Sequence, residues 1–312
     1  MDRISTAGSY AAIIANMMSA QTQLNADSAQ LSSGEVSSDL QGYGSHAETL
    51  TAMQTVQSQV GGYLNQDTIL ADKLTTQNTA LTQVASAATG ASHAVISALA
   101  AGIGDNLMQS LETQFQSAAQ GLNTTYNGEY LFAGGQVNTA PVSVNSITAL
   151  AAAPSVASVF QNDQTVSSSQ ISQNTTVQTG FLANQLGTPL MTALQAIQNY
   201  ANGPNGPFSG QLTPAQITFL TGQIATLNSA ASTLTTTAAQ NGGIQSQVSN
   251  VQIDLTNQQS TLGAMIGNIA DANVAQVSAN LQQAQLAMQA AAQVFLALQN
   301  SSLLTVLTAS GH

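Results

Sequence analysis

The 312-residue sequence contains no cysteine and no tryptophan, and only 5% of its residues are charged. Without cysteine there is no disulfide, no thiolate nucleophile and no thiolate metal site. The three histidines, His46, His93 and His312, lie far apart, so they form no spaced pair of metal ligands. These absences predict a protein that has no catalytic residues, no metal site and no cofactor.

Basic side chains are almost missing, because only Arg3 and Lys73 stand against 13 acidic residues, for a formal net charge of -11. Nucleic acids and anionic membranes both attract clusters of Lys and Arg. We therefore expect neither of them as a partner. No run of 18 uncharged apolar residues occurs, which predicts no membrane-spanning helix. The first residues lack the basic region and continuous apolar core of a cleavable signal peptide.

Apolar residues at the N-terminal end recur at the spacing of an amphipathic helix. Ile14, Met17, Leu24 and Leu31 follow one another at offsets of three and seven, which is a heptad stripe. The helix should end near Ser32-Ser33-Gly34, because glycine readily takes the left-handed conformation that closes a helix.

The C-terminal end shows the most regular pattern of the chain. Its apolar residues step by three and four without a miss, and no proline interrupts the stretch up to residue 309. This predicts a helix with one apolar face, whose main positions are Val277, Leu281, Met288, Phe295 and Leu298. Leu303, Leu304, Val306 and Leu307 make its end strongly apolar.

The middle of the chain changes period. A long helix resumes near Ala47, and a second is expected from Asp105 to Leu122. Asn127-Gly128 between β-forming residues is a strong hairpin signal, because both turn residues must accept positive φ. Residues 136–184 are rich in Val, Thr and Ser, which indicates a small β-containing insert. Helical pattern returns at Pro189, and Thr213-Pro214 predicts the start of another helix.

The expected fold is mainly α, an elongated antiparallel long-helix bundle with terminal coiled-coil helices and a small central β-containing insert. Five segments follow from the pattern. They are an N-terminal coiled-coil helix and loop (1–44), a helical rod with a β-hairpin (45–135), the insert (136–187), the returning half of the rod (188–268) and a C-terminal coiled-coil helix (269–312).

Four groups of residues are candidates for a binding or catalytic role. The run from Gly102 to Asn106 hints at a phosphate loop, but a helix–helix turn explains it better because no basic residue follows. The carboxylate pairs Asp67 with Asp72 and Glu35 with Asp39 are interpreted as solvated helix faces. His93 is interpreted as a surface or packing residue. No group predicts catalysis.

The terminal apolar stripes carry almost no charge, and little else in the chain is left to cover them. Exposed apolar surface costs about 25 cal/mol per Å² in water. We therefore expect these stripes to be buried against copies of the same chain in a helical assembly. The predicted assembly interface consists of Ile14, Met17, Leu24, Leu31, Val277, Leu281, Met288, Phe295 and Leu298.

Four stretches, in this order along the chain, resemble the bacterial flagellin family, and within it the hook-associated branch. They are Arg3-Ile4-Ser5-Thr6, Gln30-Leu31-Ser32-Ser33-Gly34, the segment from Asn127 to Gly134 with Thr139-Ala140-Pro141 after it, and Ile269-Ala270-Asp271-Ala272-Asn273-Val274 with the apolar ladder behind it. The likeness covers residues 1–135 and 245–307.

The resemblance implies a structural, non-enzymatic axial protein of the extracellular flagellum that is exported without a cleavable signal peptide. It implies that the terminal helices pair into a coiled coil. The implied partners are copies of the chain, hook-associated proteins, flagellin and an export chaperone. A hook–filament junction protein is the leading hypothesis, and a filament-forming flagellin is the main alternative. An adhesin or enzyme displayed on a helical stalk, and a translocator of a virulence export system, are less favoured.

Overall fold

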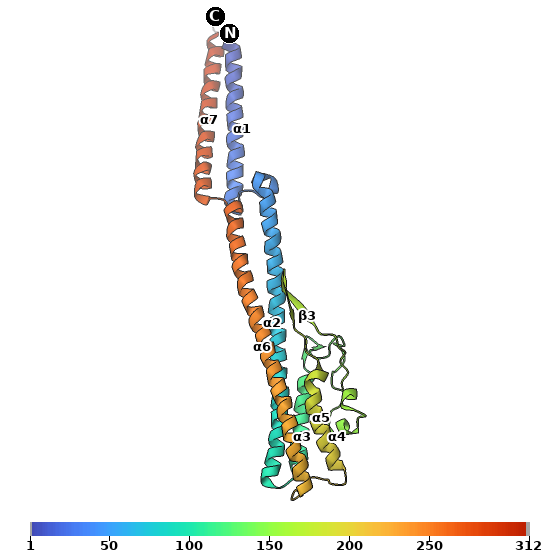
Figure 1. Ribbon diagram of the computed structural model, residues 1–312. Coiled ribbons are helices and arrows are strands. Elements are labelled where there is room, and N and C mark those ends of the chain that lie inside the picture. The colour runs from blue at the N-terminus through green and yellow to red at the C-terminus, as the bar shows by residue number, and fades with distance from the viewer. Residues whose placement is uncertain (1, 310–312) are drawn as a thin grey trace. The chain divides into compact units, whose positions relative to one another are not determined.

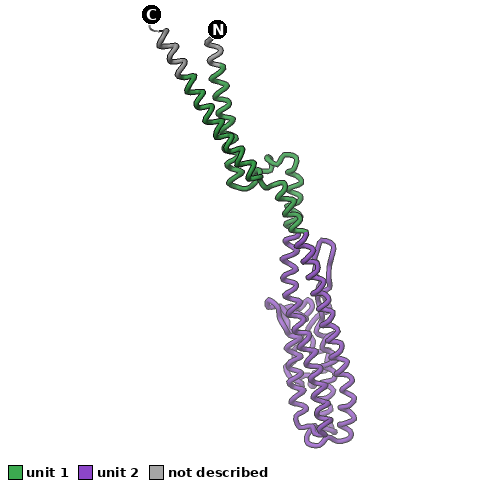
Figure 2. Tube along the Cα trace, turned by 90° about the vertical axis from the view of Figure 1, so that its left-hand side faces the viewer, with its two compact units in different colours: residues 1–59, 258–312 green, residues 60–257 purple. Residues whose placement is uncertain are grey.

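The structure is a computed structural model that describes the backbone of residues 2–309 and the side chains of residues 8–299. The described chain divides into two compact units (Figure 2). Unit 1 comprises the described residues up to Gln59 and from Gln258 onward, and unit 2 comprises Val60–Asn257. The fold is mainly α with two small two-stranded antiparallel sheets, as predicted.

Unit 1 is built from the two ends of the chain (Figure 2). It contains α1 (Asp2–Ser33), the short 3-10 helix η1 (Leu40–His46), the start of α2 (Ala47–Ala101), the end of α6 (Pro214–Ala270) and α7 (Val274–Ala309). The predicted end of α1 is confirmed, because Gly34 has a φ of 75° directly after the helix.

The helical stretch expected up to residue 309 is divided in the structure: α6 ends at Ala270 and α7 begins at Val274, close to the predicted segment boundary between residues 268 and 269. Asn273 caps α7 with its side chain, whose Oδ1 accepts a hydrogen bond from the Gln276 amide at 3.2 Å. The break has a tertiary cause as well: the Val36 amide donates to the Ala270 carbonyl, and the Ala272 amide donates to the Gly34 carbonyl. These bonds tie the segment before α7 to the segment after α1.

Unit 2 contains four longer helices that pack around one large core, and several shorter elements lie beside them (Figure 1). The helices are the rest of α2 and α6, α3 (Leu107–Leu122) and α5 (Ala183–Asn202). Phe115, Phe132 and Leu122 are among the fully buried core side chains. The shorter elements are β1 (Thr125–Tyr126), β2 (Glu129–Tyr130), α4 (Ile147–Ala152), the 3-10 helix η2 (Val156–Val159), β3 (Ser168–Ser172) and β4 (Thr175–Gln178).

The predicted hairpin at Asn127-Gly128 is confirmed. Thr125 pairs with Tyr130 and Tyr126 pairs with Glu129, and the two turn residues have φ values of 51° and 86°. Positive φ at both central residues is what a two-residue turn between right-twisted strands requires. The predicted β-containing insert is confirmed by the pair of β3 and β4.

The start of α6 agrees with the prediction, and the start of α5 does not. Thr213 and Gln216 form the expected start of α6, in which the Gln216 amide donates to Thr213 Oγ1 and Gln216 Oε1 accepts from the Thr213 amide. The predicted start of α5 at Pro189 is wrong, because the helix begins at Ala183 and contains this proline. Buried Leu186 and Leu190 explain why tertiary packing maintains the helix through the proline.

One described segment is long enough and, by mean hydropathy, apolar enough to span a membrane. It is Leu40–Ala101, whose best 18-residue window has a mean hydropathy of 1.4 and is 39% buried within the fold. Ala88, Ala91 and Val95 of α2 are fully buried in the core of unit 2. A core helix passes this test as readily as a membrane helix, so the expectation of no membrane partner stays a prediction.

Candidate assembly surface on the terminal helices

Helices α1 and α7 pack along each other in antiparallel orientation (Figure 1). The turn that follows α1 is bonded to the turn that precedes α7. The Gly34 amide closes α1 by donating to the Gln30 carbonyl at 2.8 Å, and Glu35 then forms an antiparallel bridge with Asp271. These bonds hold the C-terminal end of α1 beside the N-terminal end of α7.

The packed face of α7 is the one that the sequence predicted. Val277 and Ala284 are buried. On the same face of the helix, the half-buried side chains are Leu281, Met288, Phe295 and Leu298. The Phe295 ring meets the Tyr10 ring of α1 edge-on, with 5.7 Å between the ring centroids. All five predicted positions on α7 therefore lie on its inner face. Leu303, Leu304, Val306 and Leu307 lie outside the side chains that the structure describes.

The packed face of α1 is offset by one position from the predicted one. Met17 and Leu24 are half-buried as expected, but Ile14 is 48% exposed and Leu31 is 40% exposed. The covered positions are Tyr10, Ile13, Met17, Ala20, Leu24 and Asp27. The adjacent pair Ile13-Ile14 allows two stripes that share Met17 and Leu24, and it was the only signal in the sequence for the second stripe.

The expectation that only other copies can cover the terminal stripes is therefore wrong for one face of each helix. Seven of the nine predicted interface residues lie on the faces that α1 and α7 bury or half-bury against each other. Ile14 and Leu31 remain on the outside.

A second set of apolar side chains on the same two helices stays open to solvent. Met18 is 67% exposed and Leu286 is 64% exposed. The other large apolar residues that are exposed on these helices are Ile14, Leu31, Val274, Val294 and Leu296. One helix pair is too thin to bury apolar residues on all sides, so the α1–α7 pair presents an apolar outer surface. Scattered exposed apolar residues are ordinary, but seven on two helices form a candidate contact surface.

This outer surface is free of exposed charge over the described side chains. Residues 8–33 contain one charged side chain, Asp27, and residues 274–299 contain none. Asp27 is 2% exposed, and its Oδ1 accepts a hydrogen bond from Gln23 Nε2 at 2.9 Å. Apart from Asp27, the acidic residues that give the chain its net charge of -11 lie in other segments.

A groove of about 490 Å³ runs between α1 and α7. Amide and hydroxyl groups of Asn16, Ser19, Gln23, Asn280 and Gln283 line it, together with alanines. These groups donate and accept hydrogen bonds without carrying charge. The groove therefore adds neutral polar contacts to the apolar outer surface.

The remaining sequence candidates lie on different elements of the fold. Gly102 and Gly104 lie in a helix–helix turn, as interpreted, whose backbone bonds to Leu212 and Gly210. His93, Glu35 and Asp39 are exposed. No group of three or more potential metal ligands occurs among the described residues. The interpretation of Asp67 as solvated is wrong, since its side chain is fully buried, whereas Asp72 is exposed.

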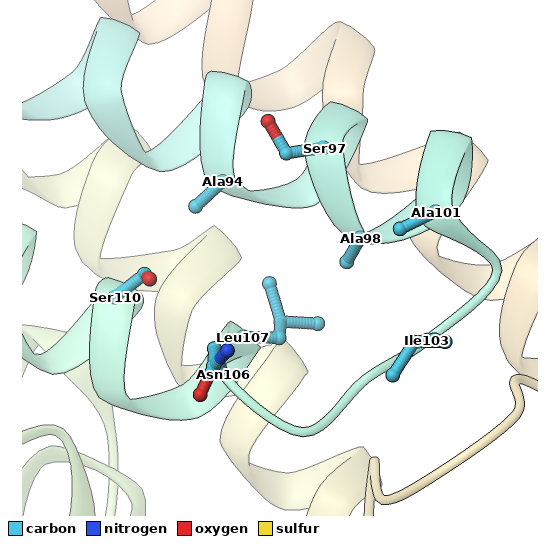
Figure 3. Close-up of a pocket in the computed structure, with 8 residues that line it drawn as sticks. All are labelled: Ala94, Ser97, Ala98, Ala101, Ile103, Asn106, Leu107 and Ser110. Carbon is cyan, nitrogen blue, oxygen red and sulfur yellow. The ribbon is translucent and has the colours of Figure 1, made fainter.

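A hollow of about 380 Å³ between α2 and α3 is shown in Figure 3. Alanines and the side chains of Ile103 and Leu107 line most of it, and its polar groups are Ser97, Asn106 and Ser110. None of the lining residues has a side chain that titrates near neutral pH, so the hollow offers no acid–base chemistry.

Comparisons with known proteins agree with this architecture. Residues 4–137 match the family model of the bacterial flagellin N-terminal helical region. The sequence matches no curated protein. Among solved structures, one described as a flagellar hook-associated protein from Vibrio parahaemolyticus is similar with a TM-score of 0.59 and 14% identity, over 75% of this chain and 99% of that one. FlgL of Bacillus cereus is similar with a TM-score of 0.52 and 12% identity, over 70% and 98% of the two chains.

At these identities the two structures establish a shared fold. The family match confirms, for the N-terminal part of the chain, the resemblance that the sequence motifs predicted.

Proposed function

We propose that this chain, whose residues 4–137 match the flagellin N-terminal helical region, is a structural subunit of the bacterial flagellum. It assembles with copies of itself through the outer surface of the α1–α7 pair, at the junction between hook and filament. The observation that supports this most directly is the set of exposed apolar side chains on two helices whose described side chains carry no exposed charge.

The free energy for assembly comes from burial of this surface. Each Å² of apolar surface removed from water contributes about 25 cal/mol. Copies with a net charge of -11 repel one another at long range, and this repulsion is screened beyond roughly 10 Å at moderate ionic strength. Because residues 8–33 and 274–299 add no exposed charge at the contact, copies can approach there without desolvating ions.

As part of the flagellum the chain is extracellular, and its partners are other flagellar components. We further propose that these are hook-associated proteins and flagellin, and that an export chaperone delivers the chain without a cleavable signal. A structural role without catalysis fits the residues that are present. In the insert, Asp163 is the one charged residue between 136 and 184, and it is bonded to Gly135 and Thr165. The division into the five predicted segments also stays a proposal.

The test compares two exposed apolar residues. Leu286→Asp places a carboxylate on the proposed contact surface and should abolish or strongly reduce self-assembly, because the charge would be buried without a partner. Ile253→Asp makes the same change at a residue of α6 in unit 2 that is 57% exposed, and it should assemble like the wild type. Sedimentation and electron microscopy of the purified chains measure both.

Normal assembly of Leu286→Asp, with normal circular dichroism, would contradict the proposal. Equal loss in both variants would point to a general effect of added charge.

A filament-forming flagellin is the second candidate, since the match over residues 4–137 supports it equally well. Both roles use the same terminal helices. The abundance of the chain in sheared flagella separates them: thousands of copies would support a filament subunit, and a trace at the base would support a junction protein.

A further inference from the structure

A carboxyl group on α2 is buried without a hydrogen-bond partner in the described part of the chain, on the helix face that packs against α6 and the β3–β4 hairpin. The Asp67 side chain is 0% exposed, and neither Oδ1 nor Oδ2 has a hydrogen-bond partner among the described residues. Residues three and four positions apart on a helix share a face, and Leu70 and Leu74 of that face are also buried. An ionisable group therefore occupies a position that is otherwise apolar.

The two helices are closely joined at this level. The side-chain amides of Asn241 and Gln245 on α6 both donate to the Leu74 carbonyl on α2, each at 2.9 Å. Val248 of α6 packs in one small cluster with Leu70 and Leu74. Asp67 lies on this same face and is not exposed, so water reaches its carboxyl group only when the packing against this face opens.

The hairpin of β3 and β4 packs against the same stretch of α2. Ile171 and Val177 of the hairpin belong to the cluster of Leu70 and Leu74. Gln66 Nε2 donates to the Gln170 carbonyl at 3.0 Å, and Gln170 Nε2 lies 3.4 Å from the Tyr63 hydroxyl. The contacts of α2 with the hairpin thus lie on both sides of Asp67 along the helix.

Few charged groups surround this position. On α2 they are Asp72 and Lys73, with Tyr63 as a further titratable group, and on the facing part of α6 the one charged residue is Asp254, which is exposed. Strands β3 and β4 contain none. No ion pair to Asp67 occurs among the described residues. Burial raises the pKa of Asp67 from 3.8 to about 6.

We propose that Asp67 makes the packing of hairpin β3–β4, α2 and α6 sensitive to pH. With a protonated carboxyl group the contact is closed. Once the carboxyl group ionises, its charge regains hydration only when the contact opens, so opening becomes more frequent as the pH rises.

The sign of the effect follows from proton linkage. A group with a raised pKa in the closed state binds more protons there than in the open state between pH 3.8 and about 6, so closure weakens as the pH rises through this window. The equilibrium constant for opening should increase about sixtyfold from pH 4 to pH 7 and then level off.

Hydrogen exchange of the full chain, corrected for the intrinsic pH dependence of exchange, measures this opening in peptides covering residues 60–75 and 168–178. Wild-type protection should fall about sixtyfold between pH 4 and pH 7. In Asp67→Asn, which cannot ionise, this fall should be absent. Asp72→Asn removes an exposed carboxylate five residues further on and should behave like the wild type.

The same pH profile in wild type and Asp67→Asn would overturn the proposal, as would protection that rises with pH. If Asp67→Asn does not fold, titration of the side-chain carboxyl carbons of the wild type by NMR decides instead. One aspartate with a midpoint near pH 6 supports the proposal, and titration of every aspartate below pH 5 overturns it.

Discussion

At the scale of single residues, the carboxylate of Asp163 joins two segments of unit 2. It accepts hydrogen bonds from the Gly135 amide, which lies 28 positions earlier, and from the Thr165 amide. Spacing along the sequence did not predict these hydrogen bonds, because the fold brings the two segments together.

Asp163→Asn should destabilise unit 2 at neutral pH but not in acid. Hydrogen bonds from the Gly135 and Thr165 amides favour the charged carboxylate and lower the pKa of Asp163 below its ordinary value of 3.8. The stabilisation is therefore present above pH 3.8 and is lost as the pH falls through the lower pKa of the folded state. Urea unfolding midpoints at pH 7 and in acid measure the difference from the wild type.

Asp254→Asn is the control for this prediction, because it removes an exposed carboxylate from the same unit. It should not change the midpoint at either pH. A pH-independent difference between Asp163→Asn and the wild type would show that the charge of Asp163 is not what matters.

At the scale of elements, periodicity identified the inner face of α7 correctly and placed that of α1 one residue away. In α7 a single ladder of large apolar residues leaves one choice of face. In α1 the stripe through Ile14 and the stripe through Ile13 are both consistent with the spacing, and packing against α7 leaves Ile13 half-buried and Ile14 48% exposed. Which face of α1 is buried depends on how α7 packs against it, so the spacing of apolar residues in α1 alone does not specify that face.

Leu281→Asp should separate α1 from α7 in the free chain. Leu281 lies half-buried on the inner face, where a carboxylate without a partner costs about 3 kcal/mol. An antiparallel pair of helices has little other packing to compensate. Hydrogen exchange in peptides of α1 and α7 should become much faster, and Leu286→Asp, whose side chain points to solvent, should leave it unchanged.

Slow exchange in Leu281→Asp would show that the α1–α7 contact does not depend on its inner face. Fast exchange in Leu286→Asp would show instead that the outer apolar residues stabilise the pair within one chain.

At the scale of the whole molecule, the two units differ in how their apolar residues are covered. The main core of unit 2 draws on α2, α3, α5 and α6 and includes fully buried aromatic rings. In unit 1 the described apolar residues of α1 and α7 are mostly half-buried or exposed. Helices without a broad partner are marginal in water. Unit 2 should therefore fold by itself, and the terminal pair should depend on assembly.

Deletion of residues 275–312 should abolish assembly and leave unit 2 folded. The deletion removes α7 apart from its first residue and no residue of the two hydrophobic clusters of unit 2. Circular dichroism should show a cooperative thermal transition, while exchange in α1 becomes fast because its partner is gone. Normal polymers of the truncated chain in electron micrographs would contradict the proposed role of the α1–α7 surface.

The sequence by itself determined the mainly α fold, the end of α1, the hairpin turn and the scarcity of charge at the chain ends, because each depends on neighbouring residues or on composition. The tertiary structure alone decided which stripe of α1 faces α7, which segment bonds to the end of α6 and that Asp67 is buried. These depend on segments far apart in the chain: the burial of a side chain is a property of what packs against it, and spacing along one helix does not specify that partner.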